Sequence, residues 1–251
     1  MAFLTRKLVP AFDDEADIGY DGTLFTTADK AGEVRMRLVI FGVSNQVGAI
    51  MDCALELKLT PSLIVMNMPE VVRPRTKSLD ERLRLYPDPP RIIQLEDFVP
   101  EEDECYFIGT VAPKRHELVE QIRSRFGITC CTLIHPTAYV SPRASVASGV
   151  YLGPHSSIGP GAQIGEQASI HARTHVGHDA IIEPYAVLMT GCGVAGYVHV
   201  GYGVSVGMQA TIIQELTIGA EAFIAAGAVV IEDVPPRVLV TGVPGRIKKS
   251  L

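Results

Sequence analysis

From Ile134 to Val230, every sixth residue is Ile, Leu or Val, seventeen times in succession without a break. Four residues after each of these aliphatic positions stands a small or aliphatic residue, most often Ala. The residue directly after the aliphatic position is frequently Gly. A period of six fits neither an amphipathic helix, which repeats every 3.6 residues, nor a strand, which repeats every two. It fits a short strand and a turn. Three such units make one triangular coil of about 18 residues, so the pattern predicts a parallel β-helix with the aliphatic side chains stacked inside.

The first half of the chain carries a different pattern, in which apolar runs alternate with amphipathic stretches. Strands are expected at 36–42, 62–67, 91–95 and 105–110, and helices from Val47 and over 114–126, with Gly127 as the end of the second helix. This alternation predicts a small parallel α/β domain of Rossmann-like type over 36–132, followed by the β-helix and a C-terminal tail over 133–251. Residues 1–35 show little period and are expected to form an extension, partly ordered by a neighbour.

Composition narrows the class of protein. The 251 residues can hold two ordinary domains, and the formal charge is −6, with Lys and Arg dispersed except for the terminal Arg246, Lys248 and Lys249. Such a chain gives no electrostatic footprint for nucleic acid. The five cysteines follow no zinc spacing and are expected to be reduced thiols. Because neither a signal-peptide core nor an apolar run of membrane-spanning length occurs, a soluble cytoplasmic protein with a small-molecule substrate and no membrane partner is expected.

The first strand of the α/β domain ends in a turn that could bind a ligand. The segment Gly42-Val43-Ser44-Asn45-Gln46-Val47-Gly48 joins the carboxyl end of a strand to a helix N-terminus, where backbone N–H groups are free. It lacks the GxGxxG spacing of dinucleotide-binding turns. A plain βα turn explains the glycines equally well.

Four of the seven histidines fall close together in the β-helix, at His155, His171, His175 and His178. Histidines are metal ligands in β-helical carbonic anhydrases, which makes a metal-dependent hydratase one alternative function. Residues 18 apart stack on neighbouring coils, and this places Arg173, Met189, Gly193 and Gly196 over the four histidines. No histidine stacks on another, so no metal is expected, although a cluster between subunits stays open.

One of these histidines suits acid–base chemistry. Acyl transfer from a thioester needs a base near neutral pH and N–H donors for the oxyanion. His178 is followed by Asp179 and lies one coil below Gly196, where no side chain obstructs a thioester and a backbone N–H can serve as donor. By spacing alone, His178 fits a polar residue on a solvated face better than a base.

A family resemblance favours the role of His178 as a base. The start MRLVIFG, the segment THVGHDAIIEPY and the ending AAGAVVIEDVPPRVLVTGVPGRIKK resemble the sialic acid O-acetyltransferase and bacillosamine-type sugar N-acetyltransferase family over about residues 36–249. The hexad pattern resembles the left-handed β-helix acyltransferases. The resemblance implies a homotrimer, with acetyl-CoA bound along the β-helix at subunit boundaries and a sugar or nucleotide sugar held by the N-terminal domain.

The resemblance also implies roles for particular residues. His178 maps to the general base, and Asp179 to the acidic neighbour that raises its basicity. The family's contacts to acetyl-CoA map to Gly196, Met208 and Ala226. The function expected is therefore an acyl-CoA-dependent O- or N-acyltransferase, with acetyl-CoA as donor and a sugar, nucleotide sugar or similar small polar acceptor.

The chain departs from the family mainly on the acceptor side. Val187 replaces a histidine that commonly touches acetyl-CoA, Asn45 and Gln46 replace Gly-His, and Asn67 stands where acidic residues are frequent. Gln46 can still donate and accept hydrogen bonds. The acceptor is expected to contact Ser44, Asn45, Gln46 and Asn67. These departures keep a third alternative open, a catalytically silent trimer that binds a ligand.

Overall fold

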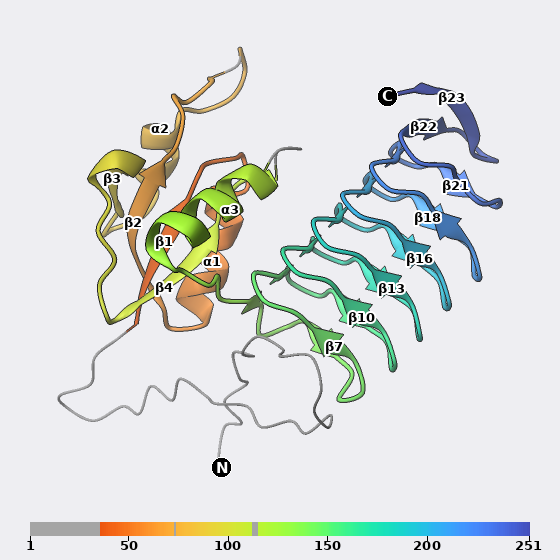
Figure 1. Cartoon of the computed structure of the whole chain (residues 1–251), viewed down its shortest axis with the longest axis horizontal. Coiled ribbons are helices and arrows are strands. Elements are labelled where there is room, and N and C mark those ends of the chain that lie inside the picture. Colours follow the sequence, from red (N-terminus) through yellow and green to blue (C-terminus); the bar gives the residue numbers. More distant parts are fainter. Residues whose placement is uncertain (1–35, 73, 112–114) are drawn as a thin grey trace. The chain divides into compact units, whose positions relative to one another are not determined.

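The computed structural model describes residues 36–72, 74–111 and 115–251, which divide into two units over 36–131 and 132–251 (Figure 1). The expected extension over residues 1–35 lies outside the described residues, as does Lys114, the first residue of the helix expected at 114–126.

The first unit contains a four-stranded parallel sheet in the order β3-β2-β1-β4. Its strands are β1 (Arg37–Phe41), β2 (Thr60–Met66), β3 (Arg91–Gln94) and β4 (Glu104–Ile108). Its helices are α1 (Val47–Glu56), α2 (Leu79–Leu83), the 3-10 helix η1 (Leu95–Asp97) and α3 (Arg115–Phe126). The apolar runs thus form the strands, and the central β1 is buried along most of its length, as expected for a parallel strand covered on both faces. The Rossmann-like assignment of this unit stays a prediction.

The helix α2 lies in a charged, proline-rich stretch and was not predicted from the sequence. The helix begins with a capping box: the Ser78 hydroxyl accepts the N–H of Glu81 at 3.2 Å, and the Glu81 carboxylate accepts the N–H of Ser78 at 2.8 Å. The sequence motif Ser-x-x-Glu is a known signal for the start of a helix and could have revealed α2. None of the described helices is long and apolar enough to span a bilayer.

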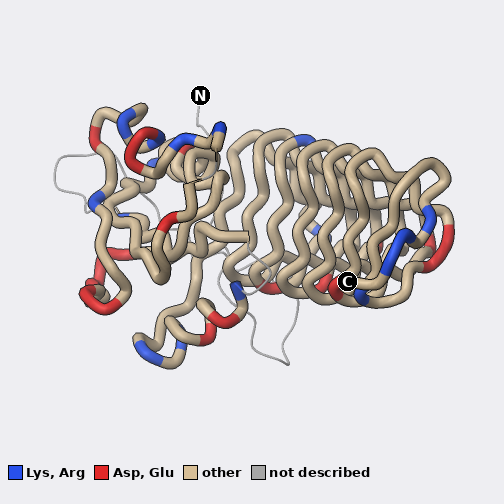
Figure 2. The backbone as a smooth tube through the Cα atoms, turned by 90° about the horizontal axis from the view of Figure 1, so that it is seen from above, with Lys and Arg blue, Asp and Glu red and all other residues tan. Residues whose placement is uncertain are grey.

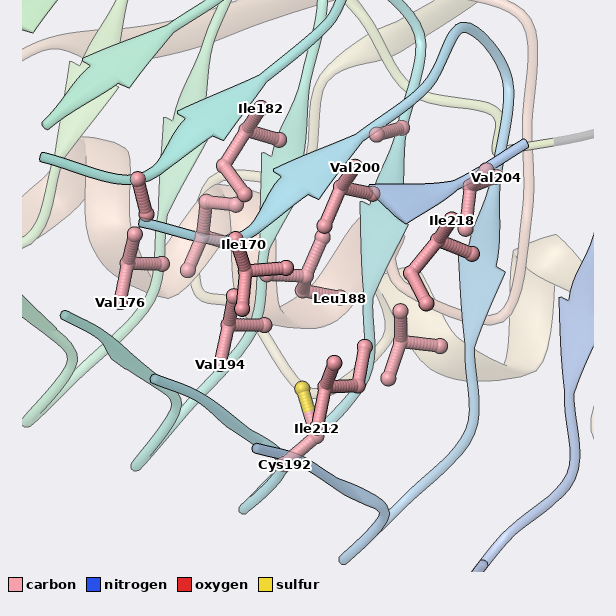
Figure 3. Packing of buried hydrophobic residues seen from close by; sticks show 14 of the residues in the cluster. Ile170, Val176, Ile182, Leu188, Cys192, Val194, Val200, Val204, Ile212 and Ile218 are labelled. Atoms are coloured by element: carbon pink, nitrogen blue, oxygen red, sulfur yellow. The ribbon is translucent and has the colours of Figure 1, made fainter. Parts of the chain in front are cut away.

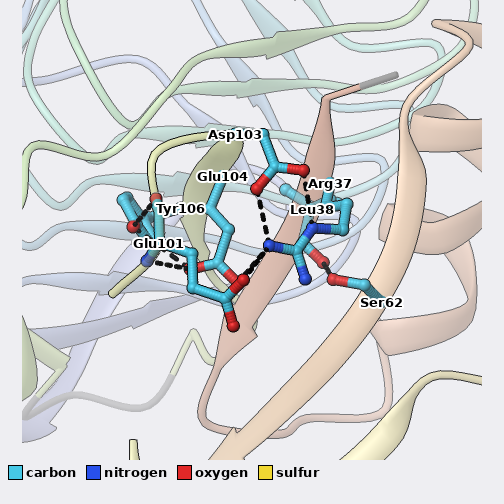
Figure 4. Close-up of polar contacts among 7 residues, drawn as sticks. All are labelled: Arg37, Leu38, Ser62, Glu101, Asp103, Glu104 and Tyr106. Atoms are coloured by element: carbon cyan, nitrogen blue, oxygen red, sulfur yellow. Dashed lines mark hydrogen bonds and ion pairs between the residues drawn. The ribbon is translucent and has the colours of Figure 1, made fainter. Parts of the chain in front are cut away.

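An arginine at the start of β1 ties this strand to the loop that precedes β4 (Figure 4). The Arg37 guanidinium donates to both carboxylate oxygens of Asp103, at 2.6 and 2.9 Å, and to Glu101 at 2.6 Å. The hydrogen bond from Arg37 lowers the pKa of the Asp103 carboxyl, and the bonds to Asp103 and Glu101 raise the pKa of the guanidinium. This network lies at the amino ends of the strands, opposite the edge where a ligand is expected.

The Arg37 network predicts a pH-dependent contribution to the stability of the first unit. Because the pKa of Asp103 is depressed in the folded state, its contribution is present above the unfolded carboxyl pKa of about 3.9 and is lost as the pH falls through the lower folded value. Arg37→Met should speed hydrogen exchange at β1 and β4 amides at pH 7, and the difference from wild type should shrink below about pH 4. A difference that stays constant down to pH 3 would contradict this assignment.

The second unit is a parallel β-helix whose two-residue strands stack into three walls (Figure 1). Wall 1 comprises β5 (Leu133–Ile134), β8 (Tyr151–Leu152), β11 (Ser169–Ile170), β14 (Val187–Leu188), β17 (Ser205–Val206), β20 (Phe223–Ile224), β22 (Val238–Thr241) and the antiparallel β23 (Arg246–Ser250). Wall 2 comprises β6 (Tyr139–Val140), β9 (Ser157–Ile158), β12 (His175–Val176), β15 (Gly193–Val194), β18 (Thr211–Ile212) and β21 (Val229–Val230). Wall 3 comprises β7 (Ser145–Val146), β10 (Gln163–Ile164), β13 (Ile181–Ile182), β16 (His199–Val200) and β19 (Thr217–Ile218).

The stacking register is the one that the six-residue period predicts. From β5 to β21, strands that are 18 residues apart pair on neighbouring coils, for example His175 with Gly193 and Val176 with Val194. The last coil departs from this spacing, because Phe223 of β20 pairs with Leu239 of β22. The aliphatic positions point inward and form one continuous buried cluster with the small corner residues (Figure 3). Many parallel strands in stacked sheets fit a left-handed β-helix, the architecture that the sequence led us to expect. Lys and Arg are dispersed, with the terminal group on β23 (Figure 2).

Two backbone features of the corners explain residue choices that the pattern only described. The third residue after most aliphatic positions has a positive φ, whether it is Gly or, as at Asp179, Tyr185 and Tyr197, a larger residue. Where glycine stands directly after the aliphatic position, the backbone of the next coil lies close to it. A Cβ on Gly165 would lie 2.6 Å from the Pro184 nitrogen and 2.7 Å from the Glu183 carbonyl carbon.

This close approach predicts that glycines of the β-helix differ in their tolerance of a methyl group. Gly165→Ala should destabilise the second unit by about 1–3 kcal/mol, because the backbone of the next coil has to shift. The matched control is Gly193→Ala, since a Cβ there would meet nothing within 4 Å and φ lies outside the left-handed region. Thermal unfolding of both variants measures the difference, and equal midpoints would contradict the explanation.

Candidate active site

His178 and Asp179 lie at the corner between walls 2 and 3, immediately after β12. Asp179 adopts the left-handed conformation, with φ of +55°, and its N–H donates to Pro160 on the coil below at 2.9 Å. The turn therefore fixes the backbone of both residues by a bond between coils. Proline at 160 and glycine at 196 are the corner residues below and above His178, so neither places a long side chain against the imidazole.

The imidazole of His178 is bonded to the neighbouring carboxylate. His178 Nδ1 lies 2.9 Å from Asp179 Oδ2, and the two side chains are 55% and 46% exposed. An ionised carboxylate can only accept a hydrogen bond, so a neutral imidazole in this contact carries its proton on Nδ1 and keeps a lone pair on Nε2. The pair can therefore act as a base through Nε2, with the carboxylate fixing the tautomer.

Gly196 lies directly against this imidazole. A Cβ at Gly196 would lie 2.5 Å from His178 Nε2 and 2.7 Å from Cε1. Only glycine at this position therefore leaves room for the imidazole in its present orientation. Among the residues that the structure describes, the Gly196 N–H donates no hydrogen bond. A Cβ on Gly177 would come within 2.6 Å of the Gly196 nitrogen, so Gly177 leaves space beside this N–H. The imidazole and this N–H are thus adjacent.

The two other residues expected to contact acetyl-CoA lie at a different corner. Met208 follows β17 and lies between walls 1 and 2, and Ala226 occupies the same place one coil above it. Both residues are exposed. A single chain thus brings His178, Asp179 and Gly196 together but keeps Met208 and Ala226 on the other side of wall 2.

The expected acceptor residues gather at the carboxyl ends of the strands of the first unit. The Ser44 hydroxyl donates to the Gly109 carbonyl at 2.7 Å and accepts the N–H of Gln46 at 3.2 Å. The Asn67 side chain lies beside Gly42, where a Cβ would meet its Oδ1 at 3.4 Å. Asn45 is exposed. The Ser44 hydroxyl therefore donates its proton to a residue that follows β4, and this proton is not available to a ligand in this conformation.

Charged residues that were not predicted from the sequence support this edge. Arg82 of α2 donates to the Ser44 carbonyl at 3.0 Å and to Glu70 at 3.2 Å, and Glu70 also accepts the N–H of Leu79 at 2.6 Å. Recognition of α2 from its capping box would have drawn attention to Arg82, although not to its partners Ser44 and Glu70.

A second histidine–carboxylate pair, also missed, lies on wall 3. His199 Nε2 lies 2.6 Å from one oxygen of Glu183, and the other oxygen accepts the N–H of Tyr202 at 2.8 Å. Both carboxylate oxygens are engaged, so this pair links two coils.

The remaining histidines do not gather around a metal position. His175 Nδ1 lies 2.9 Å from the Ser157 hydroxyl, and His171 is buried beside Tyr151. Within the described part of the chain, no three His, Cys, Asp or Glu side chains are grouped so that they could hold a metal ion.

Cys192, the cysteine nearest to this region in sequence, packs in the interior. It is 1% exposed, and burial raises the pKa of its thiol to about 11. All five cysteines are free thiols. Cys192 is therefore a corner packing residue, as the hexad pattern indicates, and an unreactive thiol.

Comparison with known proteins supports the fold. No protein-family model matches the chain, and no curated protein matches it either. A mutant of perosamine N-acetyltransferase from Caulobacter crescentus, solved with CoA and GDP-perosamine, is 24% identical with a TM-score of 0.72, covering 85% of this chain and 97% of that chain. The acetyltransferase domain of PglB from Neisseria gonorrhoeae, solved with acetyl coenzyme A, is 20% identical with a TM-score of 0.71, covering 85% and 100%.

A third solved structure, WeeI from Acinetobacter baumannii, is 18% identical with a TM-score of 0.68, covering 84% of this chain and 99% of that chain. At these identities the likeness shows that the chain has the fold of these proteins.

The contact between Gly196 and His178 predicts the effect of one added methyl group. Gly196→Ala should displace the imidazole from its place and change the side-chain NMR signals of His178. Stability should stay close to wild type, because the displaced ring is half exposed and can move outward. Gly193→Ala is the control and should leave the His178 signals in place. An unchanged His178 in Gly196→Ala would show that the ring does not rest on Gly196.

Proposed function

We propose that the chain is an acyl-CoA-dependent acyltransferase with acetyl-CoA as donor and a sugar, nucleotide sugar or similar small polar molecule as acceptor. The observation that carries this proposal is the adjacency of a carboxylate-bonded histidine and an N–H without a hydrogen-bond partner in the described residues, at His178 and Gly196. Solved proteins of the same fold give further support, since they include acetyltransferases solved with CoA or acetyl coenzyme A and, in one case, GDP-perosamine.

The geometry supports direct transfer. His178 Nε2 takes the proton of the acceptor amine or hydroxyl as that atom attacks the thioester carbonyl carbon. The Gly196 N–H donates to the carbonyl oxygen, which gains negative charge in the tetrahedral intermediate. When the carbon–sulfur bond breaks, the protonated imidazole returns its proton to the sulfur of CoA. Asp179 holds Nδ1 throughout and stabilises the imidazolium.

The proposed donor site joins two corners. Gly196 contacts the reacting end, whereas Met208 and Ala226 would contact more distant parts of acetyl-CoA from the corner between walls 1 and 2. We assign this site to a boundary between subunits of a homotrimer, because corners of neighbouring triangular coils can face each other across such a boundary. The acceptor is assigned to the edge of the first unit that carries Asn45, Gln46 and Asn67, with Ser44 shaping the turn.

The test is acyl transfer by wild type and a matched pair of histidine variants. A thermal-shift screen of CoA thioesters, nucleotide sugars and amino sugars would identify ligands, and mass spectrometry would identify the acetylated product. His178→Ala should lower the transfer rate by roughly 10²–10⁴-fold, as expected for loss of a general base, while stabilisation by CoA compounds persists. His175→Ala removes a histidine from the same wall and should retain full activity.

Three outcomes would contradict the proposal. Unchanged transfer in His178→Ala would rule out His178 as the base, and a chain that binds CoA compounds without any acetylated product would favour the silent ligand-binding alternative. Stoichiometric metal in active, purified protein would favour the hydratase.

A further inference from the structure

One exposed aromatic ring contacts the His178 imidazole. The ring centroids of Tyr197 and His178 lie 5.1 Å apart with an interplanar angle of 89°, the edge-to-face arrangement favoured by aromatic pairs. Tyr197 stands one coil above Asp179, and its N–H donates to the His178 carbonyl at 3.0 Å. Its side chain is outside the core, since the residue is 59% exposed, and its hydroxyl makes no hydrogen bond to the described residues.

The backbone at this position does not favour a large side chain. Tyr197 has φ of +58°, a left-handed conformation in which a bulky residue is unfavourable and glycine is not. The same corner two coils below carries Gly161, and equivalent positions at other corners carry Gly191 and Gly203, all with positive φ. The corner position accepts glycine as well as larger residues such as Tyr185, and the Tyr197 ring lies outside the core, so neither the backbone conformation nor core packing requires a tyrosine here.

The imidazole has few other contacts that could hold it in place. Asp179 bonds Nδ1 but is 46% exposed, and Gly196 contacts the Nε2 end without a side chain. The ring of Tyr197 packs edge-to-face against the same imidazole. A rotation of the half-exposed imidazole away from its bond to Asp179 would lose this packing.

We propose that Tyr197 is a positioning residue that holds the His178 imidazole with Nδ1 on Asp179 and Nε2 beside Gly196. The inference rests on the proposed function, in which Nε2 is the base. A base that is held in one orientation before the substrates bind is in the productive geometry more of the time, so the reaction is faster. Tyr197 acts through His178, and no contact between Tyr197 and substrate is required.

The sharpest variant is Tyr197→Gly, because it removes the ring and installs the residue that the backbone conformation prefers. Tyr197→Phe keeps the ring and removes the hydroxyl, so it should behave as wild type. Tyr185→Gly is the matched control, since Tyr185 has the same conformation, with φ of +62°, at the corner between walls 3 and 1 and packs on Tyr202. Tyr197→Ala serves as a second variant if the glycine variant does not fold.

The first measurement requires no acceptor. In protein labelled with ¹³C and ¹⁵N histidine, the His178 signals are assigned by their loss in His178→Ala. Wild type, Tyr197→Phe and Tyr185→Gly should show His178 as one tautomer with the proton on Nδ1. Tyr197→Gly should show shifts averaged over both tautomers and over more than one ring orientation. A wild-type His178 spectrum in folded Tyr197→Gly or Tyr197→Ala overturns the proposal.

The second measurement is steady-state acetyl transfer. Tyr197→Gly should lower kcat roughly tenfold and leave the KM for acetyl-CoA within about twofold, because the base is misplaced while the donor site is intact. Rescue by Tyr197→Phe separates ring packing from hydroxyl chemistry, and an equal loss in Tyr185→Gly would overturn the role. If the wild type transfers no acetyl group, the proposed function fails, whereas the NMR result still decides whether Tyr197 orders His178.

Discussion

The β-helix depends on one constraint, the fixed register between successive coils. Corner and strand N–H groups donate to carbonyls of the neighbouring coil, as in the bonds from Gly177 to Val194 at 2.8 Å and from Tyr197 to His178 at 3.0 Å. Each inward aliphatic side chain rests on another one 18 residues away, so a shift by one residue would turn the interior positions outward. The register therefore places every corner residue, including His178 below Gly196, without any contribution from a flexible loop.

This constraint explains how much of the second unit could be predicted from the sequence. The period alone placed Gly196 over His178 and Gly193 over His175, because stacking by 18 residues is a property of the backbone. The contact between His178 and Tyr197 escaped the prediction because it runs diagonally between coils and depends on side-chain direction. The left-handed conformation of Tyr197 escaped it too, since no residue type marks that position across the corners.

The first unit was less predictable because no period specifies its loops. Its strands and two longer helices followed from apolar runs, but α2 needed the capping box, and the Arg37 network joins residues far apart in sequence. Ser44 shows the limit most clearly. A serine in a strand-to-helix turn suggests a ligand contact, yet its hydroxyl donates to Gly109, a residue at the end of another strand. Such a partner is known only once the strand order is known.

The exposure of His178 has a consequence for how the proposed reaction is completed. A histidine that is 55% exposed works largely in water, where the bond from a single N–H to a developing oxyanion contributes little. Rate enhancement by the His178–Gly196 pair thus requires that bound substrate or a second subunit exclude water from this corner. A corner between two walls of a triangular coil points outward, so a single β-helix cannot enclose a ligand at this corner. The position of Met208 and Ala226 on the next corner fits this requirement, because a donor that reaches both corners would cover the imidazole. The regular coil supplies the proposed base and the proposed N–H donor in register, and enclosure has to come from outside that coil.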